Sequence, residues 1–188
     1  MSLKLNNMKA GAGKAERIPE GTYMGRMATV VDLGVQAQTD YLTGEEKPAK
    51  AEVLITFELP TERIDVQTED GETVSKPRWI SKQYAASNSE MSNLYKLVQA
   101  LNSKVGDVSE LIGTACMISV GSTSGGNAKI TNVIKAPNGM DIAEVESGGS
   151  FFDFDAPDEE NFLKNPEWVR TKIMDAENYN GFADGWGA

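Results

Sequence analysis

The sequence predicts a mainly β protein with five strands and one helix between the third and fourth strands. Apolar and polar side chains alternate in three runs before residue 88, which is typical of half-buried strands. The apolar period changes to three and four residues over positions 88–103, and alternation returns in two runs between residues 114 and 137. These three observations define the fold class.

The first predicted strand covers residues 21–36. Its odd-numbered positions are largely apolar, and Gly25 and Gly34 interrupt the run. Glycines inside a strand favour bends or bulges, which allow one long strand to serve two parts of a curled sheet.

The second strand, residues 51–60, has the clearest pattern. Its odd-numbered residues are all apolar, and Pro60 is expected to end it because proline cannot donate a ladder hydrogen bond. The segment that follows is polar and contains Asp70-Gly71, a hairpin turn signal. A third strand is predicted over residues 78–87.

The helix is predicted within residues 87–103, with Ser87 or Ser89 as its N-cap. A further helical turn is expected at 109–113, closed by Gly113. The change of period marks the point where the chain leaves the first three strands.

Strands at 114–123 and 127–137 complete the order, joined by a glycine-containing hairpin. Three strands, a helix and two strands is the segment order of the OB-fold, a small Greek-key barrel. We therefore predict a five-stranded OB-fold-like Greek-key barrel over residues 18–137. Other five-stranded barrels and sandwiches remain alternatives.

Composition excludes several function classes. The chain has no histidine, so a Ser-His-Asp triad, a Cys-His pair and histidine-ligated metals are excluded. Its single cysteine, Cys116, lies in an apolar run and is expected to be a buried, inert thiol in a reducing compartment. No apolar run is long enough to span a bilayer. We expect a non-enzymatic cytoplasmic protein without cofactor or metal.

Charge is distributed unevenly along the chain. Residues 1–137 carry 15 Lys/Arg against 16 Asp/Glu, whereas residues 138–188 carry 3 against 12. This division predicts a near-neutral body (18–137) and an acidic tail (138–188). The small, basic and Gly/Ala-rich start of the chain predicts a flexible N-terminal arm (1–17), and Asn165-Pro166-Glu167, with Asn165 as cap, predicts a short helix at about 166–176. Carboxylate pairs in the tail are interpreted as solvated charges rather than metal ligands.

A barrel of this size without catalytic residues is commonly a nucleic-acid or oligosaccharide binder. Binding of a single strand requires cations for the phosphates and exposed rings for base stacking. The candidates for these roles are Arg26, Tyr41, Lys50, Arg78, Trp79, Lys82, Tyr84, Lys129 and Lys135. Trp79 and Tyr84 have opposite parity, so at most one faces the ligand, and the face of Arg78, Lys82 and Tyr84 is preferred. Arg26 has the alternative role of a solvated strand residue.

The tail interleaves aromatic residues with carboxylates, a pattern suited to docking on another surface. The partner-docking candidates are Phe151, Phe152, Phe154, Trp168, Phe182 and Trp186. The tail can fold back on the body or extend to a neighbouring subunit, and a homodimer is one possibility. A mobile acidic tail would also compete with nucleic acid for a basic groove, so its removal is expected to strengthen binding.

Several stretches of the chain carry a resemblance to a known family. They are GTYMGRMATVVDLGVQ, VLITFELP, RWISKQYAASNSEMSNLYKLVQAL, LIGTACMISV, GNAKITNVIKAP and, in the tail, PEWVRTKIMDAENYNG. Together they resemble phage-encoded single-stranded DNA-binding proteins with an OB-fold, over about residues 18–137. The resemblance implies a protein that coats single strands during phage replication and recombination, with an acidic tail that recruits replication proteins. Members of the family often end in an exposed aromatic residue, whereas this chain ends GFADGWGA. The alternative is a non-enzymatic phage structural or assembly module built on a β-barrel.

Overall fold

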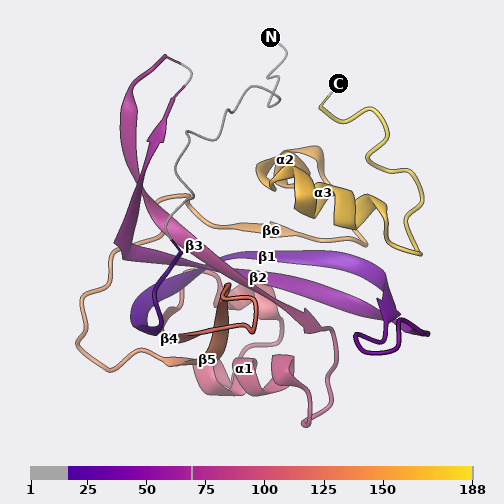
Figure 1. Ribbon diagram of the computed structural model, residues 1–188, viewed down its shortest axis with the longest axis horizontal. Coiled ribbons are helices and arrows are strands. Elements are labelled where there is room, and N and C mark those ends of the chain that lie inside the picture. Colours follow the sequence, from indigo (N-terminus) through magenta and orange to yellow (C-terminus); the bar gives the residue numbers. More distant parts are fainter. Residues whose placement is uncertain (1–16, 69, 188) are drawn as a thin grey trace.

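An antiparallel sheet forms the centre of the protein in its computed structural model, which describes residues 17–68 and 70–187 (Figure 1). The strands are β1 (Gly21–Thr39), β2 (Glu46–Gln67), β3 (Thr73–Ala85), β4 (Ala115–Ser122) and β5 (Ala128–Lys135), in the order β3-β2-β1-β4-β5. The predicted mainly β fold and strand sequence are confirmed. Among the described residues no ladder joins β3 to β5, so the sheet is open. The arm predicted over residues 1–17 lies outside the described residues, apart from Arg17.

Strand β1 is long and bent, as its glycines predict. It pairs with β4 through residues 21–26 and with β2 through residues 26–39. A side chain at Gly25 would place its Cβ 2.5 Å from the Glu58 carbonyl oxygen, so the change of partner requires glycine there. Gly34 has φ +69° and lies in a register shift between β1 and β2. One strand therefore links both halves of the sheet.

Strand β2 does not end at Pro60, contrary to the sequence-based prediction. The register with β3 shifts between Leu59 and Arg63, and pairing then resumes as far as Gln67. Proline is accommodated because the irregularity removes the need for its missing N–H donor. The two strands form a ribbon closed at the predicted turn, where Gly71 has φ +79°.

Helix α1 (Asn93–Asn102) lies between β3 and β4 in the chain, where the sequence predicts it. Its N-cap is Ser92 rather than Ser87 or Ser89, since the Ser92 hydroxyl accepts the Tyr95 N–H at 3.0 Å. The short 3-10 helix η2 (Val108–Leu111) follows and ends before Gly113, whose φ is +85°.

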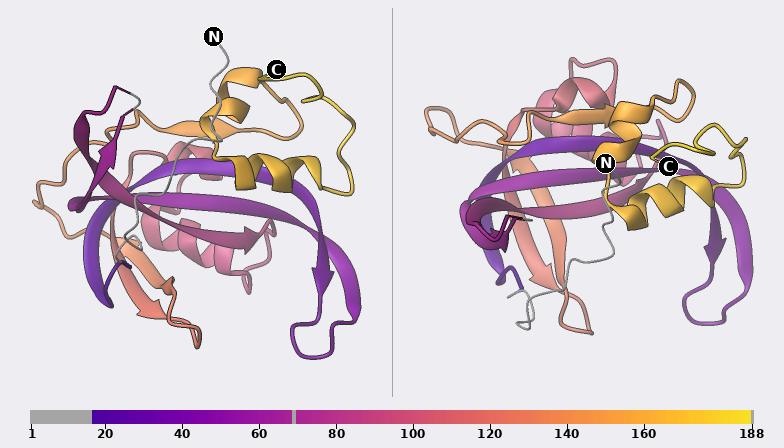
Figure 2. Two further views of the ribbon diagram at one scale, coloured as in Figure 1. Left: turned by 45° about the horizontal axis from the view of Figure 1, so that its top comes forward. Right: turned by 90° about the horizontal axis from the view of Figure 1, so that it is seen from above.

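Two apolar cores lie on opposite faces of the sheet. The inner core contains Phe57 and Ile118 of the strands together with Leu97 and Leu101 of α1. The outer core packs the residues of β6 (Ser150–Phe152), α2 (Glu159–Lys164) and α3 (Glu167–Met174) against the other face. Residues 150–187 are called the C-terminal layer. Figure 2 shows this layer and α1 on opposite sides of the sheet.

The C-terminal layer is attached to β1 at two places. Strand β6 pairs in parallel with Thr29–Val31. Further along, the Val35 carbonyl accepts the Glu177 N–H at 2.8 Å, and the Val35 N–H donates to Asn178 Oδ1 at 2.8 Å. The residues that the sequence assigns to a mobile tail therefore form a packed second layer, and the acidic segment folds back on its own sheet.

The helix predicted at about 166–176 corresponds to α3. Asn165 does not cap its start. The Asn165 amide instead donates to the Asn161 carbonyl at 2.8 Å and closes α2. None of the helices within residues 17–68 and 70–187 has the length and apolar character needed to cross a bilayer.

Candidate nucleic-acid interface

A groove of about 370 Å³ lies where the C-terminal layer ends on the outer face of the sheet. We call it the indole groove, because it contains two tryptophan rings. It is lined by Thr29, Leu54, Thr56, Trp79, Ser81, Ser147, Ser150, Lys164, Asn165, Pro166, Trp168 and Val169. Its volume is at the lower end of the range found for small-ligand sites.

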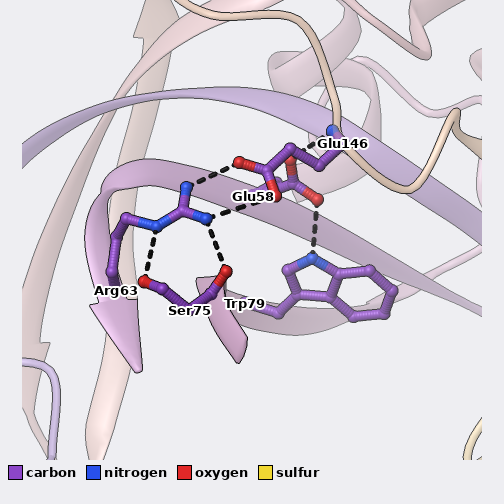
Figure 3. Close-up of polar contacts among 5 residues, drawn as sticks. All are labelled: Glu58, Arg63, Ser75, Trp79 and Glu146. Carbon is purple, nitrogen blue, oxygen red and sulfur yellow. Dashed lines mark hydrogen bonds and ion pairs between the residues drawn. The ribbon is translucent and has the colours of Figure 1, made fainter. Parts of the chain in front are cut away.

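Trp79 stands on β3 with 43% of its surface exposed. Its Nε1 donates to Glu58 Oε2 at 2.9 Å, and Glu58 is only 2% exposed (Figure 3). The other Glu58 oxygen accepts the Glu146 N–H at 2.7 Å. The buried carboxylate therefore has two partners, and it holds the indole by its polar edge while the ring stays accessible to a ligand.

Arg63 supports this arrangement from the ribbon. Its guanidinium forms an ion pair with Glu146 at 2.6 Å and donates to the Ser75 side chain and carbonyl at 3.0 and 2.7 Å (Figure 3). The hydrogen bond from Arg63 lowers the pKa of Glu146 below its usual value. Residues 138–149, which link β5 to the C-terminal layer, are thereby fastened beside Trp79.

The sheet residues that line the groove include Leu54 and three hydroxyl residues, Thr29, Thr56 and Ser81, which we call the hydroxyl floor. Thr56 and Ser81 share a hydrogen bond of 2.8 Å between their hydroxyl oxygens. Thr29 and Thr56 are both buried. Hydroxyls donate and accept, so such a floor can pair with the edge of a planar heterocycle.

The preferred face of Arg78, Lys82 and Tyr84 does not offer an exposed ring for stacking. Tyr84 is 5% exposed and belongs to the inner core, and this burial raises the pKa of its hydroxyl. The reason is strand register, because Tyr84 lies opposite Val53 and shares that residue's inward side. Lys82 lies 5.3 Å from the Tyr84 ring centre and reaches the Ile130 carbonyl on β5 at 3.4 Å. Trp79 points to the opposite side of β3, and its ring is the exposed one.

Arg26 is occupied inside the protein and is not a free phosphate ligand. Its guanidinium donates to the Ile142 carbonyl at 2.8 Å and to the Gly113 carbonyl at 2.7 Å, and it pairs with Glu144 at 2.9 Å. Its side chain is 19% exposed. Arg26 therefore clamps the linker to the sheet.

The other nucleic-acid candidates lie outside the groove. Tyr41 is 92% exposed on the β1–β2 loop. Lys50 is exposed and lines a second, shallower pocket with Met91. Arg78 is partly buried, and Lys129 and Lys135 are exposed on β5. Only Trp79 of the nine candidates lines the indole groove.

The aromatic residues assigned to partner docking are mostly engaged within the chain. Phe152 and Phe154 are buried in the outer core, and Phe182 and Trp186 pack against it. Phe151 packs against the inner core. Trp168 is different, since it is half exposed and lines the groove. Phe152 and Phe154 are therefore not available to a partner, because their own sheet already covers them.

Sequence reasoning missed Glu58 and the hydroxyl floor. A usable signal was present, because Glu58 is the one charged residue between Val53 and Pro60, in an otherwise largely apolar strand. A carboxylate at such a position is rarely buried without a partner.

Cys116 is fully buried, as its apolar surroundings predict. Burial raises the pKa of its thiol to about 12, so the reactive thiolate is scarce at neutral pH. The described residues contain no cluster of three or more His, Cys, Asp or Glu side chains arranged to hold a metal ion.

Comparisons of the chain with models of protein families, with curated proteins and with solved structures found no match.

Proposed function

We propose that the protein binds single-stranded DNA on the outer face of β2 and β3, without strong sequence preference. In this proposal it coats strands exposed during phage replication and recombination in the host cytoplasm and performs no catalysis. The observation that carries the proposal is Trp79, whose exposed indole is fixed by a buried carboxylate above a hydroxyl floor. Stacking on a fixed ring suits any base, because every base has a π face.

The topology supports the same proposal. The chain order of three strands, a helix and two strands is the one expected for an OB-fold, and the open sheet is compatible with the partly open barrel of that fold. Lys82 contacts β5 through the Ile130 carbonyl, at the seam where such a barrel would close. In OB-folds the face of strands two and three is the usual oligonucleotide surface, and Trp79 lies on that face here.

Charge constrains how the ligand is held. The chain carries a net charge of −10, so its overall charge repels DNA and local cations must contact the phosphates. Lys50, Lys129 and Lys135 are exposed on the body and are assigned this role. The carboxylates of the C-terminal layer are assigned to contacts with replication or recombination proteins.

The test is a fluorescence titration of the full chain with labelled oligo-dT at two salt concentrations. We expect salt-dependent binding with quenching of tryptophan emission, weakened about tenfold by Trp79→Ala, since loss of one stacking ring typically costs ~1–3 kcal/mol. Ile64→Ala, an exposed apolar residue on the same ribbon, is the control and should bind normally. Affinity weaker than about 10 µM at low salt would reject the proposal.

A second candidate is a non-enzymatic assembly module. Ile64 and Val74 are exposed on the ribbon, and Tyr41 and Leu42 on the β1–β2 loop. Exposed apolar tips of this kind suit protein contacts. Absence of DNA binding, together with self-association that Ile64→Lys abolishes, would favour this function.

A further inference from the structure

The second wall of the indole groove comes from the C-terminal layer. Trp168, at the start of α3, is 51% exposed and lines the same groove as Trp79. Its neighbours Val169 and Ile173 are almost fully buried in the outer core. Helix α3 is therefore anchored by one side, while its largest side chain stays at the groove.

Buried polar contacts fix this wall relative to the sheet. The Gln36 side chain of β1 is 7% exposed, and its amide donates to the Lys172 carbonyl of α3 at 2.9 Å. Asn165, also buried, closes α2 immediately before α3. Because these contacts already order the wall, ligand binding costs it little conformational entropy.

One cation of the layer also lies at the groove. Lys164 lines it, and its ammonium pairs with Glu160 at 2.8 Å. Both side chains are well exposed, and a pair of that kind contributes little stability. The ammonium is therefore available to turn toward a phosphate.

We infer that the C-terminal layer forms half of the single-strand site: an unpaired base enters the indole groove between Trp79 of the sheet and Trp168 of α3, and Lys164 contacts a neighbouring phosphate. This inference rests on the proposed function. It reverses the expectation that the acidic segment competes with DNA for the body, because here the segment supplies a stacking ring and a cation to the site.

The experiment compares full-length variants by oligo-dT titration. We expect Trp168→Ala to weaken binding about five- to tenfold, similar to Trp79→Ala, with an unchanged salt slope because no phosphate contact is lost. Lys164→Gln should weaken binding and reduce the salt slope by about one. Met174→Ala is the matched control, since Met174 is exposed on the same helix and does not line the groove. Circular dichroism and thermal melting confirm that each variant folds.

The outcomes separate the two proposals. If the wild type does not bind oligo-dT, the proposed function fails and this inference fails with it. If Trp79→Ala weakens binding while Trp168→Ala matches Met174→Ala, the proposed function stands and this inference is overturned. Tighter binding by Trp168→Ala would also overturn it, because the layer would then obstruct the site.

Discussion

The two faces of the β1–β2 sheet carry cores of different construction. The inner core is largely aliphatic and is closed by α1, which directly follows β3 in the chain. The outer core is rich in aromatic rings, and it is closed by a layer that begins at Ser150, after a linker. The ring centre of Phe152 lies 5.8 Å from that of Phe162 and 6.2 Å from that of Phe182.

The difference shows how a site arises at the edge of a core. The outer face is apolar at Val31, Leu33 and Leu54, where the C-terminal layer covers it. It becomes polar at Thr56 and Glu58, which are also buried but lie outside the apolar outer core. The inner face has no such transition within β2, because every inward residue from Val53 to Leu59 is buried and apolar. The groove lies where the outer core stops.

The largest expected effect is in the inner core. Phe57→Ala should lower the free energy of unfolding by about 3–5 kcal/mol, because a fully buried ring is replaced by a cavity. Urea denaturation measures the loss. Ile64→Ala, on the exposed part of the same strand, should cost under about 1 kcal/mol. Equal effects of the two substitutions would show that the inner core is not the main source of stability.

A truncation in the outer core should act more locally. Phe152→Ala removes a buried ring and is expected to cost about 3 kcal/mol. Because the layer has its own core, it should open before the sheet does. Hydrogen exchange should therefore accelerate in α2 and α3 more than in α1. Phe151→Ala, which alters the neighbouring residue on the inner side, should not produce this difference, and uniform acceleration would make the two cores one cooperative unit.

Removal of the Arg26 side chain, which joins the sheet to the linker (residues 138–149), should have an intermediate effect on stability. Arg26→Ala leaves the Ile142 and Gly113 carbonyls without their donor, at a cost of about 1–3 kcal/mol measured by thermal melting. Arg26→Lys should restore little, since an ammonium lacks the planar fork of donors. Affinity for oligo-dT should stay within about twofold. A tenfold loss of affinity with normal stability would instead indicate that Arg26 contacts DNA.

The smallest effect concerns Asp32 of β1, which lies near Asp153 and Asp155 of the C-terminal layer. Burial, followed by the nearby carboxylates of Asp155 and Asp153, raises the pKa of Asp32. The folded state therefore holds this proton more tightly than the unfolded chain. Its contribution to stability is fully present below the unfolded pKa and is lost as the pH rises through the raised folded pKa.

Asp32→Asn should remove that dependence. The variant keeps an oxygen to accept the Gly34 N–H, which donates to Asp32 at 2.9 Å in the native chain. Relative to the wild type it should gain stability as the pH rises, by less than about 1.4 kcal/mol because the site is partly exposed. Urea midpoints across the pH range measure this, with the exposed Asp65→Asn as control. Parallel curves for Asp32→Asn and wild type would contradict the raised pKa.

Local patterns in the sequence were sufficient to predict most of the secondary structure. Alternation located the strands and the change of period located α1. Gly34 marked one register shift of β1, and Gly25 lies next to the point where β1 changes partner. These features depend on neighbours within a few residues, so a single chain displays them. The composition likewise determined that no histidine chemistry is possible.

The tertiary structure alone decided which side of each element is covered. Parity cannot tell whether Trp79 or Tyr84 faces inward, because that depends on the register of β3 against β2. Nor does an acidic composition reveal that Phe152 and Phe154 are buried, since Val31 and Leu33, which share their core, lie more than 100 residues away in the chain. Burial is a property of two surfaces in contact, and a sequence pattern describes only one of them.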